Sequence, residues 1–371
     1  MGKSTWWNLV KVDVLFGSDA VDPRPEWALM PSSLQLSGQP KLPIARLSVL
    51  HGRAQSRSDT REALRVKEDG KFKFVQISDT HMVTGVGVCK DAIDADGNSL
   101  PESEADSLTV GFIGKILDVE NPDLVILTGD QLHHDILDSK SALFKVVAPI
   151  IERSIPFAAV FGNHDSEGIH ALSRTAQMSI LQNLPFSLCE SGPEHVDGIG
   201  NFCLQILAPA PSESPLSTLY FLDSHGQIPS KTDNSDYDHI KQSQIMWFRD
   251  ISQTLRRARE KDGISALGCG HDHVNDFCAL LPQRSQQGGD TTTQLGPWLC
   301  YGGGSGFGGY CSYDGMRFHR RTRVWELDTG TGSLKTWKRV EYVTDRVDEL
   351  VLVESGVVVD SLGTRMESEI V

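Results

Sequence analysis

The sequence predicts an α/β protein with a metal site at the carboxyl ends of its strands. Short apolar runs, such as residues 72–77 and 124–127, alternate with longer helix-like segments. Four apolar runs lead directly into metal-ligand residues: Asp79-Thr80-His81, Gly129-Asp130, Gly162-Asn163-His164-Asp165 and Gly270-His271-Asp272-His273. Open α/β sheets form their ligand sites just beyond the carboxyl ends of the strands. The order of these motifs therefore predicts one shared site, with Asp223-Ser224-His225 as a weaker fifth segment.

The alternation of strand and helix begins near residue 71. We expect strands at residues 72–77, 124–127, 157–161 and 219–222, and a hairpin at 322–340 that turns at Asp328-Thr329-Gly330. We expect helices at residues 106–119, 139–153, 170–182 and 242–261, with Ser139 as an N-cap. Residues 1–70 are interpreted as an extension that packs on the main domain at 71–345, and residues 346–371 as an acidic C-terminal tail.

The charge and hydropathy of the sequence argue against nucleic-acid and membrane partners. The formal net charge of -14 opposes the attraction to phosphate backbones on which nucleic-acid binding depends, so no nucleic acid is expected. No run of about 18 apolar residues is present, so no membrane-spanning helix is expected. The amino terminus lacks a signal-peptide pattern, and Trp6 stands where myristoylation favours Ser or Thr.

The cysteines favour a reducing compartment. Their number, seven, is odd, and no close pairs suggest a disulfide framework or a zinc site. We therefore expect reduced, mostly buried thiols. Because no Asn-x-Ser/Thr sequon occurs either, the sequence predicts a cytoplasmic, intracellular protein.

The ligand residues suit a pair of cations. Asp79 and His81 alternate at a strand end and can both turn toward one ion. Asp130 is the natural bridging carboxylate of a two-metal site, where the ions lie about 3.5–4 Å apart. Asn163 offers a neutral oxygen, and His271 and His273 can bind one ion each. Singly, each residue is more often a turn former or an ordinary polar residue, and their joint order is what favours metal.

His164, next to the Asn163 ligand, is the candidate general acid and electrostatic stabiliser, with Asp165 orienting it. The alternatives for His164 are a seventh metal ligand or a brace behind the ligands. The nucleophile would be a metal-bound hydroxide, since coordination lowers the pKa of water to about 7. Carboxylate, amide and imidazole ligands are compatible with Fe, Mn or Zn.

These motifs resemble those of the calcineurin-like metallophosphoesterases, in the fungal and plant purple-acid-phosphatase-like branch. Further runs that resemble this branch are Thr128-Gly129-Asp130-Gln131-Leu132 and Cys300-Tyr301-Gly302-Gly303-Gly304. The resemblance spans about residues 12–340 and implies a four-layer α/β/β/α sandwich, two metal ions and hydrolysis of phosphate monoesters, with phosphoproteins among the candidates. It places Asp79, His81, Asp130 and His273 on the first metal, and Asp130, Asn163 and His271 on the second. Where the purple enzymes have a metal-binding tyrosine, this chain has His133, so no purple colour is expected.

One family feature is missing from this chain. The resemblance implies a further metal-binding histidine on a strand that precedes the last motif. In this chain the segment from Leu255 to Ile264 runs directly into the last motif, Gly270-His271-Asp272-His273, and no such histidine or strand is present in the sequence. The sandwich is therefore expected to lack one strand, and His225, His239 or His133 is the possible substitute ligand. The alternative function is an impaired homologue that acts by binding or regulation. The glycine-rich run at 302–309 matches no P-loop, and tight turns beside the site are favoured over a phosphate nest.

Overall fold

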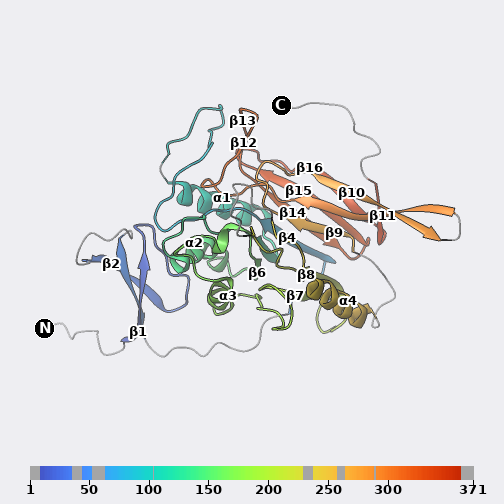
Figure 1. The fold of residues 1–371 in the computed structure, drawn as a ribbon, viewed down its shortest axis with the longest axis horizontal. Helices are drawn as coiled ribbons and strands as arrows, with labels where there is room; N and C mark the ends of the chain where they lie inside the picture. The colour runs from blue at the N-terminus through green and yellow to red at the C-terminus, as the bar shows by residue number, and fades with distance from the viewer. Residues whose placement is uncertain are drawn as a thin grey trace.

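A computed structural model describes residues 9–35, 44–51, 63–102, 104–228, 237–256, 264–287 and 290–360. Its centre is a seven-stranded sheet of order β17-β16-β15-β14-β4-β5-β6 (Figure 1). These strands are β4 (Lys71–Ile77), β5 (Leu124–Thr128), β6 (Phe157–Val160), β14 (Arg321–Asp328), β15 (Ser333–Val340), β16 (Val347–Glu354) and β17 (Val357–Val358). β4, β5 and β6 pair in parallel, whereas the other pairings are antiparallel. The predicted hairpin is confirmed as β14 and β15.

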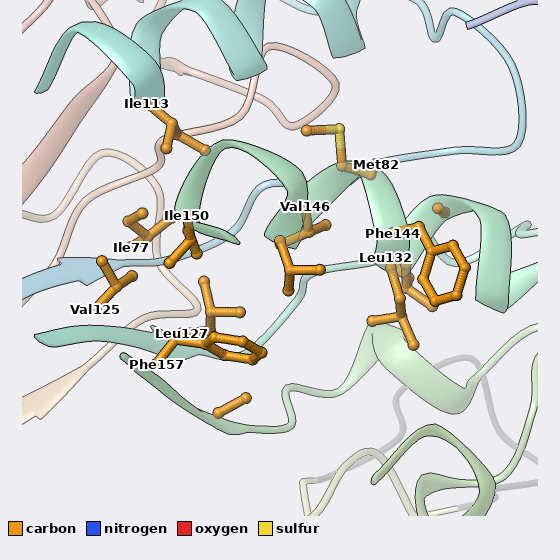
Figure 2. Packing of buried hydrophobic residues seen from close by; sticks show 14 of the residues in the cluster. Ile77, Met82, Ile113, Val125, Leu127, Leu132, Phe144, Val146, Ile150 and Phe157 are labelled. Atoms are coloured by element: carbon orange, nitrogen blue, oxygen red, sulfur yellow. The ribbon is translucent and has the colours of Figure 1, made fainter. Parts of the chain in front are cut away.

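The parallel strands need crossover helices, and these form one outer layer. α1 (Ala105–Glu120) joins β4 to β5, and α2 (Ser139–Ile151) joins β5 to β6. Side chains from both helices interlock with those of the strands in a continuous apolar core (Figure 2). The cap of α2 is Asp138, whose carboxylate accepts from the Ser141 N–H at 2.8 Å, so the expected cap at Ser139 is wrong by one residue.

The C-terminal end of α1 is tied to the sheet through a buried carboxylate, Glu120. It accepts from Trp337 Nε1 at 2.9 Å, from Arg339 Nε at 2.5 Å and from Lys73 Nζ at 3.0 Å. Burial pulls the pKa of Glu120 upward, but these three donors outweigh burial and hold the pKa below its usual value.

The opposite face of the sheet is covered by a second β layer. One part pairs β7 (Phe202–Leu207) with β8 (Pro215–Phe221), and the other has the order β10-β11-β9. The bounds of this second group are β9 (Ala266–Cys269), β10 (Cys278–Gln287) and β11 (Asp290–Tyr301). Apolar clusters fill the space between the layers. α4 (Gln242–Arg256) lies outside β7 and β8, with Phe248 edge-on to Tyr220 at 4.9 Å (Figure 1). The predicted α/β fold with four layers, α/β/β/α, is confirmed.

The second β layer is divided. Among the described strands, β8 pairs only with β7, and β9 pairs only with β11. The sequence of β9, Ala-Leu-Gly-Cys, has no charged residue, as expected of a buried strand. The strand is nevertheless mostly exposed, and 43% of the Leu267 surface is accessible to solvent. The prediction of a lost strand concerns residues 255–264, of which 257–263 lie outside the described part of the chain. The exposed edge of β9 is what a missing neighbour would leave.

The ends of the chain add further strands. β1 (Leu9–Phe16), β2 (Trp27–Leu34) and β3 (Ala45–His51) form a separate antiparallel sheet, which contacts α2 through a 2.8 Å hydrogen bond from the Phe16 N–H to Ser141 Oγ. At the other end, the prediction of a tail at residues 346–371 is wrong for residues 347–358, because β16 and β17 extend the central sheet, and residues 361–371 lie outside the described part of the chain. The acidic residues of β16 lie among apolar ones, and Leu352 and Val353 face the core.

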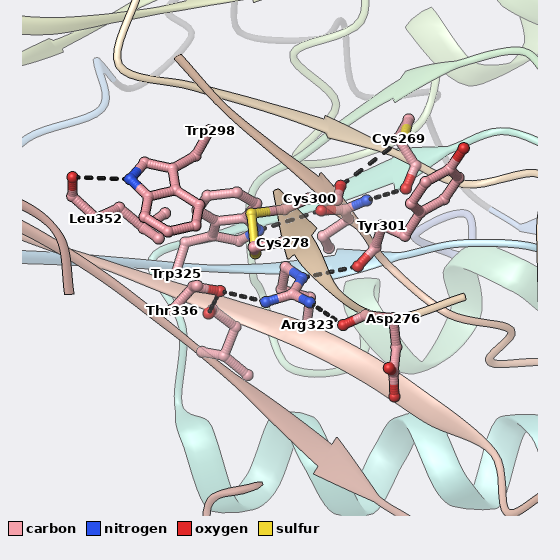
Figure 3. Close-up of a disulfide and its surroundings, with 12 residues drawn as sticks. Cys269, Asp276, Cys278, Trp298, Cys300, Tyr301, Arg323, Trp325, Thr336 and Leu352 are labelled. Atoms are coloured by element: carbon pink, nitrogen blue, oxygen red, sulfur yellow. Dashed lines mark hydrogen bonds between the residues drawn. A yellow bond between two sulfur atoms is a disulfide. The ribbon is translucent and has the colours of Figure 1, made fainter. Parts of the chain in front are cut away.

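A disulfide joins β10 to β11, which corrects the expectation of seven reduced thiols. Cys278 and Cys300 are direct cross-strand partners with Cα atoms 4.1 Å apart (Figure 3). Spacing along the chain did not reveal the pair, because strand pairing brings together residues 22 positions apart. The expectation of a cytoplasmic location loses the support of seven thiols and stays a prediction.

Arg323 lies beside the disulfide, between the two β layers. Its Nε donates to the Tyr301 carbonyl at 2.8 Å, and burial lowers its pKa to about 10 (Figure 3). The remaining described elements are α3 (Arg174–Gln182), η2 (His164–Ser166), β12 (Ser312–Tyr313) and β13 (Met316–Arg317). None of the helices in the described ranges has the length and apolar character that crossing a bilayer requires.

Candidate metal centre

The parallel strands bring the first three motifs together. Because β4, β5 and β6 pair in register, Asp79, Asp130 and Asn163 follow neighbouring strand ends. Backbone hydrogen bonds continue past the strands: the Asp79 N–H donates to Gly129 O and the His81 N–H to Asp130 O, both at 3.0 Å. The sheet edge thus extends into the loops that carry the ligands.

The last motif reaches the same edge from β9. The His271 N–H donates to both Asp79 carboxylate oxygens, at 3.0 and 3.1 Å. The glycine-rich run closes over these segments, since the Gly304 N–H donates to His273 O at 2.8 Å and the Gly306 N–H to Asp79 O at 3.1 Å. Its glycines permit close backbone approach to the ligands, which agrees with turns beside the site.

Strained backbone marks the ligand positions. The φ angles of Asp79, His81, Asp130 and His271 are 55°, 47°, 50° and 79°. This left-handed region is uncommon for residues other than glycine and costs about 1–3 kcal/mol each. Such conformations persist only where the surroundings enforce them, and they cluster at functional sites.

Three side chains converge on a first metal position. Ligand atoms of Asp79, His81 and His273 lie within 4.8 Å of one another. His273 Nδ1 lies 2.7 Å from the Tyr310 carbonyl and donates to it, so Nε2 keeps its lone pair. That Nε2 faces His81 Nε2 at 3.0 Å and Asp79 Oδ1 at 3.8 Å.

A second group lies next to the first. His271 Nδ1 and Asn163 Oδ1 are 2.9 Å apart, and Asp130 lines the same cavity as His271 and His273. Asp130 Oδ1 also accepts from the His164 N–H at 2.8 Å. The structure therefore brings the six candidate ligands together at one sheet edge, and their division between two metals stays a prediction.

The electrostatics of these groups suit cations. Burial raises the pKa of Asp79 well above its usual value, and repulsion from Asp130 raises it further. Burial and nearby imidazoles lower the pKa of His81, and burial lowers that of His273 to about 3. The buried His81 Nδ1 and Asn163 Nδ2 have no hydrogen-bond partner within the described ranges. Buried carboxylates and neutral imidazoles that face one another fit a dinuclear metal site.

His164 lines the cavity, but its partner is not the one expected. His164 Nδ1 lies 2.5 Å from Glu167 Oε2. Asp165 instead accepts from the backbone N–H groups of Gly162, Asp130 and Leu132, at 2.8–3.0 Å. Asp165 therefore holds the two ligand loops together, and the prediction that it orients His164 is corrected in favour of Glu167.

Three histidines are the candidate substitute ligands for the second metal position. Their side-chain contacts lie elsewhere than at His271 and Asn163. His225 Nε2 bonds to Gln244 Oε1 at 2.8 Å, and His239 is exposed. His133 lies at the cavity but on the side of His81, with ring centroids 5.7 Å apart. Asp223, the weaker fifth candidate, forms an ion pair with Arg174.

Sequence reasoning missed several residues that line the cavity, which has a volume of about 250 Å³. They are Lys90, His134, Tyr237 and Tyr310, whereas Gly309 belongs to the glycine-rich run already expected beside the site. Tyr310 stacks on His273 with ring centroids 4.1 Å apart, and Tyr237 lies edge-on to His271 at 4.9 Å. These residues sit in loops without a motif, so only the His133-His134 doublet gave a signal in the sequence.

The fold and the site define a class: residues 72–275 match the family described as calcineurin-like phosphoesterase, and the chain belongs to that family. Among its relatives, Phosphatase DCR2 of Saccharomyces cerevisiae is 32% identical over 389 residues, covering 89% of this chain and 64% of that protein. The chain thus spans less than two thirds of the length of that relative. Two Arabidopsis thaliana proteins are also similar. Probable inactive purple acid phosphatase 28 is 29% identical, covering 79% of this chain and 86% of that protein. Probable inactive purple acid phosphatase 29 is 30% identical, covering 76% and 85%.

Proposed function

We propose that this protein is a metal-dependent phosphatase that hydrolyses phosphate monoesters at a dinuclear site. The observation that carries the proposal is the convergence of five buried candidate ligands and the more exposed His271, whose polar atoms face one another. Asp79, His81, Asp130 and His273 would hold one ion, and Asp130, Asn163 and His271 the other. When bound, the ions would supply a nucleophilic water at neutral pH and offset the charge of the phosphate.

The side chains around the ligands have separate tasks. His164 lines the cavity and would protonate the leaving oxygen, with Glu167, 2.5 Å from its Nδ1, orienting its ring. Asp165 holds the loops of Asp130 and Asn163 in register through three backbone N–H groups. Asn163 binds without adding negative charge, which favours an anionic phosphate.

The second candidate function is a binding or regulatory role with impaired catalysis. It is favoured by the unequal ligand groups, since His, Cys, Asp and Glu side chains of the described residues form a three-member cluster only at the first metal position and at the cavity rim. Relatives named as probable inactive phosphatases also support it. Metal content separates the two functions, because a working phosphatase needs two tightly held ions per chain.

The test is hydrolysis of an aryl phosphate by metal-loaded protein. His164→Ala should lower kcat by about 100-fold, as expected for loss of a general acid, and Asp130→Ala should lower it at least as much. Asp250→Ala, an exposed change on α4, is the matched control and should leave kcat unchanged. Hydrolysis that survives both site changes would rule out this assignment of roles.

A further inference from the structure

A rim of three basic side chains borders the cavity beside His164 and His81. Its members are Lys90, from the loop after β4, and His133 and His134, from the loop after β5, and all three line the cavity. The His133 and His134 rings have centroids 4.1 Å apart, and His134 lies 5.7 Å from His164. The rim therefore continues directly from the candidate general acid.

The side-chain hydrogen bonds within the rim use only one of the three N–H donors of the Lys90 ammonium group. His133 Nδ1 donates to Asp135 Oδ1 at 2.7 Å, so its Nε2 accepts from Lys90 Nζ at 3.2 Å. An ammonium group has three donors, and one of them is used here. Lys90 forms no ion pair with a carboxylate of the described residues. Among the described residues that line the cavity, Asp130 is the one carboxylate, and it is a candidate metal ligand.

The backbone of the rim is fixed rather than loose. The Lys90 N–H donates to Phe307 O at 2.9 Å, and the Lys90 carbonyl accepts from the buried Arg320 guanidinium. The His133 N–H donates to Met82 O at 3.0 Å. Lys90 is thus anchored to the same glycine-rich run that packs on the metal-ligand segments.

The position of the rim indicates what it meets. Because His164 protonates the leaving oxygen, groups beside it face the alcohol part of the substrate rather than the phosphoryl group being transferred. We propose that Lys90, supported by His133 and His134, binds a second anionic group, carboxylate or phosphate-like, on the leaving-group side. Building on the proposed phosphatase function, the substrate class is then a small phosphomonoester whose alcohol part carries a further negative charge.

The test uses substrates that differ only in this second charge. They are phenyl phosphate, 3-carboxyphenyl phosphate and 3-phosphonophenyl phosphate, given to the manganese-loaded protein. The wild type should prefer either charged substrate by about fivefold in kcat/KM, which corresponds to about 1 kcal/mol and to one exposed ion pair. Lys90→Met should reduce the preference to below twofold through KM, and Lys90→Arg should retain most of it. Lys115→Ala, which removes an exposed charge from α1, is the control and should change nothing.

Calorimetric binding of the matching phosphonates keeps the test independent of turnover. Phenylphosphonate, 3-carboxyphenylphosphonate and 1,3-phenylenediphosphonate should show the same order and the same loss in Lys90→Met. A preference for one charged compound alone identifies the second group as carboxylate or as phosphate-like. Equal binding of charged and uncharged compounds, or equal losses for both in Lys90→Met, overturns the subsite. A binding preference without turnover of any substrate contradicts the phosphatase function and leaves the subsite standing.

Discussion

Adding one methyl group at Gly309 should displace two candidate metal ligands, His273 and His81. A Cβ on Gly309 would lie 2.3 Å from His273 Cε1, 2.6 Å from His273 Nδ1 and 2.9 Å from His81 Cδ2. Gly309 is not among the residues with positive φ, so alanine suits its backbone, and the collision alone decides the outcome. The His273 ring cannot move away freely, because Tyr310 stacks on it and accepts from its Nδ1.

The size of the effect follows from the collision. Ordinary contact begins at 3.4 Å, so the His273 ring must shift by roughly 1 Å, whereas metal–ligand distances tolerate about 0.2 Å. Weakening a metal-supporting interaction costs about 10- to 100-fold in affinity, and displacing a ligand should cost at least that. Overpacking should also lower the free energy of unfolding of the metal-free protein by about 1–3 kcal/mol.

The assay is calorimetric titration of manganese into metal-free Gly309→Ala, with denaturant unfolding measured in parallel. Gly111→Ala is the matched control, because Gly111 lies on α1 with nothing within 4 Å of a new Cβ. It should leave metal affinity unchanged and stabilise the helix slightly. Metal affinity of Gly309→Ala equal to that of the wild type would refute the proposed ligand positions.

Three further outcomes are expected. Glu167→Gln removes the carboxylate beside His164 Nδ1 and should lower kcat about tenfold while leaving metal content intact; an unchanged kcat in aryl phosphate assays would contradict the orienting role. Glu120→Gln should lower the free energy of unfolding by about 3 kcal/mol at pH 7. Because the pKa of Glu120 is lower in the folded protein, its contribution to stability is present above about pH 4.5 and is lost as pH falls through the folded pKa. The difference in unfolding free energy between wild type and Glu120→Gln, measured by denaturant titration, should therefore shrink in acid. A difference independent of pH would contradict this explanation. Replacing Cys278 and Cys300 by alanine should lower stability by about 3 kcal/mol without reductant and by much less with it, and equal losses in both conditions would argue against the disulfide.

The parallel core and the ligand set were predictable because their signals are local. β5 and β6 are short apolar runs, β4 alternates apolar with polar residues, and each leads into a ligand motif, so parallel pairing brings the motifs together. The residues Asp79, Asp130 and Asn163 could therefore be assigned to one site from the sequence alone. The acidic character of residues 347–354 misled the interpretation, since Leu352 and Val353 supply a buried strand face that net charge does not reveal.

The remaining features depend on local turn geometry or on tertiary contacts that spacing along the chain does not encode. Glu167 lies three residues after His164, but only the turn at η2 directs it to the ring, while Asp165 turns toward the backbone. The disulfide depends on the register of β10 and β11, and Lys90 reaches the cavity because Phe307 and Arg320 anchor its backbone. Apart from the local contact between His164 and Glu167, these contacts join segments whose proximity is set by the fold as a whole.

The central claim is that this chain holds two neighbouring metal ions. The most direct measurement is anomalous diffraction at the metal absorption edge from crystals grown with manganese. We predict two anomalous peaks about 3.5–4 Å apart on either side of Asp130, one beside His81 and His273 and one beside Asn163 and His271. A single peak beside His81, or none, would contradict the dinuclear account and favour the impaired homologue.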